Sequence, residues 1–182
     1  NKVISNFINI LTALRIILAI IIFILLINKD GYMLALILFI VAGLTDYLDG
    51  FFARKYNATS EIGEILDPIA DKILIIFILF SLSVNLSSFL IAFSASLIIS
   101  REIWVSALRD FSARNQISNA TKVTYLAKIK TSTQLFTIFV YLFGLAVSKM
   151  FFILIADILM VVSVLITIYT GYIYTVNVIR SR

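Results

Sequence analysis

Four aspartates lie between two long apolar runs of the sequence, and their spacing is typical of side chains that share helix faces. Asp46 and Asp49 are three residues apart, and Asp67 and Asp71 are four apart, so each pair falls on one face of a helix. Ionised carboxylates at a membrane boundary are costly unless a cation neutralises them. The four aspartates are therefore the first candidates for a metal site.

Small residues share these two faces. Gly50 and Ala53 follow Asp46 at offsets of four and seven, and Gly63 precedes Asp67 by four. We expect a short polar link, residues 56–62, to fold the two helices antiparallel and to bring the faces together. Four carboxylates would then surround a small space suited to two divalent ions about 3.5–4 Å apart and to in-line phosphoryl transfer. The alternative is that the four aspartates are ordinary charges at helix ends. The small residues between them make this alternative less favoured than a metal site.

The residue types that are absent restrict the chemistry further. The sequence contains no cysteine and no histidine, which excludes disulfides, thiolate chemistry and imidazole bases. A carboxylate or a lysine must then handle protons, and any metal must be held by oxygen. Oxygen ligands favour Mg²⁺, Mn²⁺ or Ca²⁺ over zinc.

Helices that cross a membrane must position these groups. The 182 residues are 62% hydrophobic with a mean hydropathy of +1.08, whereas soluble domains are nearer half apolar. A spanning helix needs about 20 apolar residues. We therefore predict an all-α integral membrane protein, a single domain over residues 1–182, with the first run a membrane helix and not a removable signal. The six predicted transmembrane segments are 9–28, 32–55, 64–84, 86–110, 124–147 and 150–178.

The basic residues predict the orientation in the membrane. Of the 15 lysines and arginines, Lys29 and Lys149 fall in the links after the first and fifth predicted helices, and the others lie at or near the opposite side. Positive loops favour the cytoplasm, so we expect both termini and the acidic cluster to face the cytoplasm from the inner membrane. A nucleic-acid partner is not expected, because the basic residues abut apolar helices.

The aspartate pattern resembles the signature of the CDP-alcohol phosphotransferases at every fixed position. This resemblance spans most of the chain, although Ile8 replaces a proline that is often found before the first-helix motif. The matching motifs are Asn9-x-x-Thr12-x-x-Arg15, Asp46-x-x-Asp49-Gly50-x-x-Ala53-Arg54 and Gly63-x-x-x-Asp67-x-x-x-Asp71.

The resemblance implies an activity and a set of roles. Members of this family transfer a phosphatidyl group from a CDP-lipid to an alcohol and release CMP, and they are typically homodimers with a cytosol-facing cavity. By resemblance, Asp46, Asp49, Asp67 and Asp71 would hold two divalent ions, Mg²⁺ or Mn²⁺, and Asp71 would also take the proton of the attacking hydroxyl. The implied CDP-lipid site consists of Asn9, Thr12, Gly50, Ala53, Arg54, Ser60 and Gly63.

A second set of basic residues bears on the acceptor alcohol. Arg101, Arg109, Lys128 and Lys130 are expected at the cytosolic ends of the fourth and fifth helices, where they could clamp a phosphate. The segments around them resemble a bacterial branch of the family that uses glycerol 3-phosphate. We therefore expect transfer from CDP-diacylglycerol to sn-glycerol 3-phosphate, giving phosphatidylglycerophosphate and CMP. The alternative is that these residues only set the topology and contact anionic membrane lipids.

Two rival functions stay open at this point. A sibling enzyme would use inositol, serine or phosphatidylglycerol as its acceptor. A divalent-cation transporter is a more distant alternative, since carboxylates inside a membrane also mark ion pathways. The sequence favours an enzyme, because the carboxylates cluster at one side and no inverted repeat is evident.

Overall fold

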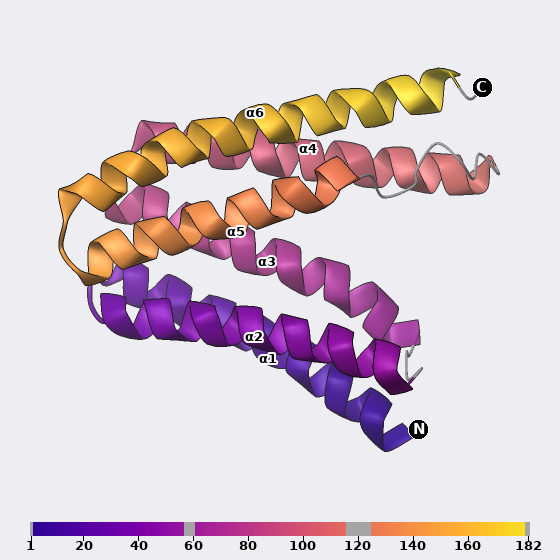
Figure 1. Ribbon diagram of the computed structural model, residues 1–182, viewed down its shortest axis with the longest axis horizontal. Helices are drawn as coiled ribbons and strands as arrows, with labels where there is room; N and C mark the ends of the chain where they lie inside the picture. Colours follow the sequence, from indigo (N-terminus) through magenta and orange to yellow (C-terminus); the bar gives the residue numbers. More distant parts are fainter. Residues whose placement is uncertain (1, 57–60, 116–124, 181–182) are drawn as a thin grey trace.

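The computed structural model describes residues 2–56, 61–115 and 125–180, and this part of the chain is all-α (Figure 1). It contains six long helices and no strand, as predicted. Each one overlaps a predicted segment and extends at most a few residues beyond it, except that the first begins earlier. The helices are α1 (Lys2–Ile27), α2 (Tyr32–Tyr56), α3 (Glu61–Asn85), α4 (Phe89–Arg114), α5 (Tyr125–Ala146) and α6 (Met150–Arg180).

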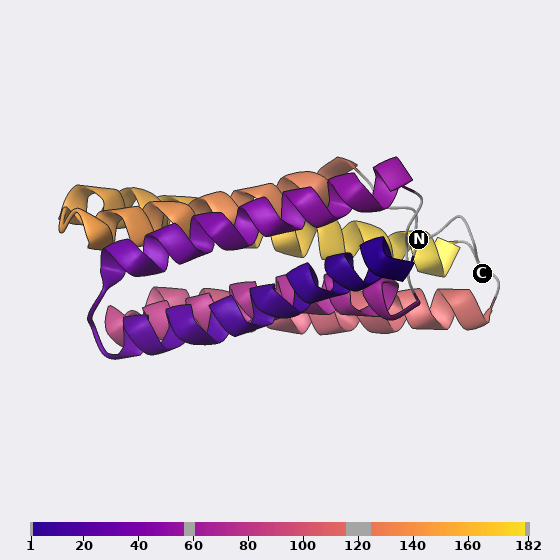
Figure 2. The same ribbon diagram turned by 90° about the horizontal axis from the view of Figure 1, so that it is seen from below.

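All six helices are long and apolar enough to cross a membrane. They lie side by side along the long axis of the molecule, and both termini lie at the same end (Figure 2). Helix α1 packs on α2 and α3, while α6 packs on α4 and α5. Contacts of α3 with α4 and α5, and of α2 with α5, join the two groups. The protein is thus a multi-pass membrane bundle.

Three tight turns connect the helices at the end away from the termini. Lys29, Ser87 and Ser148 adopt positive φ angles of 55°, 49° and 54° in these turns. In the first turn the N–H of Asp30 donates to the carbonyl of Leu25 at 3.2 Å, and the other two turns repeat this pattern. These bonds satisfy carbonyls that a helix end leaves without partners, so each pair of helices is held close at this end.

The apolar core occupies the half of the bundle next to these turns. Ile22, Ile78 and Leu142 are buried there from α1, α3 and α5. The Asn85 side chain closes the same end by donating to the carbonyl of Leu26 at 2.6 Å. Towards the termini, α1–α3 diverge from α4–α6 (Figure 1), and the polar residues of interest lie in that half.

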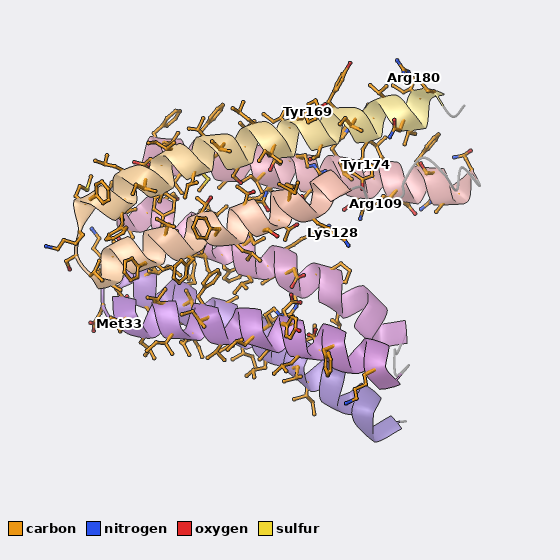
Figure 3. The ribbon with its side chains drawn as sticks, viewed as in Figure 1. Met33, Arg109, Lys128, Tyr169, Tyr174 and Arg180 are labelled. Atoms are coloured by element: carbon orange, nitrogen blue, oxygen red, sulfur yellow. The ribbon has the colours of Figure 1, made fainter. Side chains whose placement is uncertain are left out.

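The charges follow the same division. Lys29 and Lys149 lie at the end with the tight turns. Arg109, Lys128 and Arg180 lie in the half nearer the termini (Figure 3). The basic residues are therefore distributed unequally between the two ends, as the sequence predicted.

Candidate active site

Three of the four predicted aspartates meet around one arginine. Arg15 of α1 is fully buried, and its Nη1 lies 3.1 Å from Asp46 Oδ1 and 2.5 Å from Asp71 Oδ1. Its Nη2 donates to Asp49 Oδ2. Aspartates of α2 and α3 thus meet through Arg15 of α1, which packs on both helices, whereas α2 and α3 do not pack directly on each other within the described residues. The Asp67 side chain lies outside the described residues.

The three carboxylates differ in exposure. The Asp49 side chain is 5% exposed, whereas those of Asp46 and Asp71 are 49% and 43% exposed. Asp46 and Asp71 also line a cavity of about 500 Å³ between α3, α4 and α5. Asp49 is therefore the buried anchor of the cluster, and the other two aspartates are accessible to a ligand in the cavity.

The donor set of this cluster fits a divalent cation. Carboxylate oxygens are the ligands that Mg²⁺ and Mn²⁺ prefer, and one guanidinium supplies a single positive charge against three negative ones. Among the described side chains, however, no three acidic groups are arranged as a preformed metal site, and the Arg15 guanidinium bonds to all three described aspartates. Further positive charge would be attracted to the accessible oxygens of Asp46 and Asp71.

The residues that the resemblance assigned to the CDP-lipid are only partly described. Thr12 is buried one turn before Arg15, and Asn9 is half-buried one turn earlier. Gly50 and Gly63 lie on α2 and α3, the two helices that carry the aspartates. Ser60 and the side chains of Ala53 and Arg54 lie outside the described residues.

The predicted basic residues line the same cavity as Asp46 and Asp71. Arg101, Arg109, Lys128 and Lys130 all contribute to its wall from α4 and α5. Figure 3 shows Arg109 and Lys128 in the same part of the molecule, with Tyr174 of α6 beside Arg109. The Arg109 guanidinium lies 5.4 Å from the centre of the Tyr174 ring and donates to its hydroxyl at 3.3 Å.

Arg101 and Lys130 differ from the other two cations because both are buried. Arg101 Nη1 donates to Glu102 Oε1 at 3.0 Å, and its Nη2 donates to Thr170 Oγ1 at 3.0 Å. Lys130 Nζ donates to the same Glu102 oxygen. A Cβ at Gly171 would stand 3.0 Å from Arg101 Cγ, so the glycine lets the arginine pass close to α6.

Three residues at the site were not predicted from the sequence to have a role. Arg15 belongs to the first-helix motif but had no role of its own, and no role was predicted for Lys72 or Glu102. Lys72 Nζ donates to Ser106 Oγ at 2.9 Å and lies 4.0 Å from Glu102 Oε2. The position of Glu102 could have indicated a role, because a glutamate inside an apolar run is costly unless it is paired.

Comparisons with known proteins identify the family of the chain. A model of the family described as CDP-alcohol phosphatidyltransferase matches residues 5–169. A protein of Rickettsia typhi is 35% identical over 175 residues, covering 93% of this chain and 95% of its own length. A protein of Rickettsia bellii is 38% identical over 143 residues, covering 78% of this chain and 77% of its own. Both relatives are named CDP-diacylglycerol–glycerol-3-phosphate 3-phosphatidyltransferase.

Proposed function

The chain belongs to the CDP-alcohol phosphatidyltransferase family and is a membrane enzyme, and we propose that it transfers the phosphatidyl group of CDP-diacylglycerol to sn-glycerol 3-phosphate. The observation that carries this proposal is a cavity lined both by carboxylates of α2 and α3 and by cations of α4 and α5. Asp46 and Asp71 suit a reacting phosphate with its metal ions, and Arg109 and Lys128 suit an acceptor that bears a phosphate. The names of the relatives support the same donor and acceptor.

In this reaction the primary hydroxyl of glycerol 3-phosphate attacks the lipid-side phosphorus of CDP-diacylglycerol. A new P–O bond forms, the P–O bond to CMP breaks with its electron pair, and the hydroxyl proton passes to Asp71. Two divalent ions, magnesium or manganese, held by Asp46, Asp49, Asp67 and Asp71, would supply positive charge to the pyrophosphate and to the departing CMP. Arg15 holds Asp71 and Asp49 in fixed positions through its two terminal nitrogens.

The remaining assignments complete this proposal. The CDP-lipid would contact Asn9, Thr12, Gly50, Ala53, Arg54, Ser60 and Gly63, because the resemblance assigns them and six of them lie on α1, α2 and α3, the helices that carry Arg15 and the aspartates. Both termini and the cavity would face the cytoplasm. The resemblance also implies a homodimer, which the mass of the detergent-solubilised protein tests.

The orientation has a direct test because the chain has no cysteine of its own. A cysteine introduced at Lys149 should react with a membrane-impermeant maleimide added outside intact cells, and one at Arg180 should not. The reverse pattern would overturn the proposed orientation.

The function is tested by CMP release from CDP-diacylglycerol by the purified protein with Mg²⁺ or Mn²⁺. Glycerol 3-phosphate, inositol, serine and phosphatidylglycerol are supplied separately. Release with glycerol 3-phosphate alone is the expected result. Release with another alcohol would keep the chemistry at the aspartates and overturn the acceptor, and no release with any of them would overturn the proposal.

A further inference from the structure

Glu102 of α4 is an acidic residue in the otherwise basic part of the cavity wall. Its two carboxylate oxygens have different surroundings. Oε1 accepts hydrogen bonds from Arg101 and from Lys130. Oε2 has no hydrogen bond within the part of the chain that the structure describes, and Lys72 Nζ stands 4.0 Å from it. One oxygen is thus held firmly, and the other remains able to accept a hydrogen bond.

The partners of Glu102 are better placed to hold it than to bind a phosphate. Arg101 and Lys130 are both buried, and Arg101 is also fixed by its bond to Thr170. A cation that already donates to a half-buried carboxylate must give up that charge-assisted bond before it can bind another anion. Arg109 and Lys128 are therefore the two cations available to bind the acceptor phosphate. The sequence had predicted this role for all four basic residues.

Glu102 lines the same cavity as the proposed base Asp71 and the proposed phosphate-binding residues Arg109 and Lys128. Asp71 is adjacent in sequence to Lys72, whose Nζ bonds to Ser106 and approaches Glu102. Glu102, Ser106 and Arg109 are spaced by four and three residues, so they share one face of α4. From Glu102 to Arg109 the helix rises about 10 Å. A short acceptor with its hydroxyl at Asp71 and its phosphate near Arg109 would pass Glu102.

We propose that Glu102 is a specificity-determining residue that accepts a hydrogen bond from the secondary hydroxyl of the acceptor. This inference rests on the proposed function. It explains how the enzyme would distinguish a glycerol phosphate from other alcohol phosphates. A fixed carboxylate is a strong acceptor for a hydroxyl, and its Oε2 would remain without a partner when the hydroxyl is missing. The enzyme should therefore select acceptors that carry a donor on the middle carbon.

Two acceptor analogues test this in the wild-type enzyme. The monophosphate of propane-1,3-diol keeps the primary hydroxyl and the phosphate but lacks the secondary hydroxyl. Dihydroxyacetone phosphate replaces that hydroxyl by a carbonyl, which cannot donate. A hydrogen bond to a charged group corresponds to about 10–100-fold in kcat/KM, and we expect glycerol 3-phosphate to be preferred to both analogues by this factor. Equal use of the three acceptors would overturn the inference without any variant.

The variant Glu102→Gln then separates recognition from support of the fold. We expect its kcat/KM for glycerol 3-phosphate to fall towards that for the propanediol phosphate, so that the preference shrinks to about threefold or less. Thr170→Val is the matched control, because it removes a bond of Arg101 and leaves the Glu102 carboxylate in place. This control should lower kcat/KM for glycerol 3-phosphate and for the propanediol phosphate by the same factor, so that the preference for glycerol 3-phosphate is kept.

The outcomes distinguish the inference from the function on which it rests. Equal losses for both acceptors in Glu102→Gln, with the preference retained, would assign Glu102 a purely structural role and overturn the inference alone. Absence of turnover with glycerol 3-phosphate in the wild-type enzyme would overturn the proposed function and the inference with it. If Glu102→Gln does not fold, equal use of the analogues and glycerol 3-phosphate by the wild-type enzyme would still overturn the inference.

Discussion

Replacing Arg15 by methionine should destabilise the metal-free protein far more than loss of an exposed ion pair. Methionine preserves much of the length of the side chain and removes the charge, so three carboxylates lose the guanidinium between them. Removing one partner of a buried ion pair costs about 3–5 kcal/mol. Here only Asp49 is deeply buried, and Asp46 and Asp71 are nearly half exposed. We therefore expect the lower end of that range, about 3 kcal/mol.

The measurement is the free energy of unfolding in mixed micelles with increasing SDS and with EDTA present. Arg114→Met is the matched control, because Arg114 pairs with Asp110 at 2.9 Å while its side chain is 77% exposed. Exposed pairs of this kind contribute about 0.5 kcal/mol or less.

The expected role of a divalent ion gives the same experiment a second readout. Mn²⁺ in place of EDTA should narrow the gap between Arg15→Met and the wild type, because the ion supplies positive charge to the same carboxylates. A loss no larger than that of Arg114→Met would refute the buried charge cluster. A gap that Mn²⁺ leaves unchanged would refute the link between Arg15 and the metal site.

Three further predictions follow from the same geometry. Asp71→Asn should abolish CMP release while largely sparing binding of the CDP-lipid in an equilibrium assay, and full activity would remove Asp71 as the base. Arg109→Ala should raise the KM for the acceptor more than the KM for the CDP-lipid, because Arg109 lines the cavity together with Lys128. Equal increases in the two KM values would contradict a role of Arg109 in acceptor binding. Gly144→Ala should lower the free energy of unfolding in SDS by about 1–3 kcal/mol, because the new Cβ would stand 2.9 Å from Ile153 Cδ1 and 3.0 Å from Phe152 Cβ. A stability equal to that of the wild type would show that α5 and α6 separate there without cost.

The sequence was sufficient to predict the helices and the acidic faces, because both depend on local periodicity. Apolar runs of spanning length define α1–α6, and the offset of three residues places Asp46 and Asp49 on one face of α2. The position of Arg15 among them could not be predicted in this way. It depends on the rotation and depth at which α1 packs against α2 and α3, which are properties of the packed bundle.

The sequence also could not predict which of the four basic residues is available to a substrate. Arg101, Arg109, Lys128 and Lys130 are equivalent in a sequence, since all four are cations near helix ends. Packing separates them, because Glu102 and Thr170 engage Arg101, and Glu102 also engages Lys130. Which cation remains available to a substrate therefore depends on contacts between helices, such as those of Arg101 with Thr170 and of Lys130 with Glu102, which the sequence does not show.

Helix α3 explains how one bundle serves two substrates at once. Successive residues of an α-helix point about 100° apart, so the neighbours Asp71 and Lys72 face different parts of the bundle. Asp71 meets Arg15 of α1, whereas Lys72 meets Ser106 of α4. A donor bound beside α1 and α2 and an acceptor bound beside α4 and α5 would thus meet at α3, where the proposed base stands. Since the tight turns and the apolar core fix these helices at the opposite end, the distance between the two proposed substrate sites would be set by the packing of the helices.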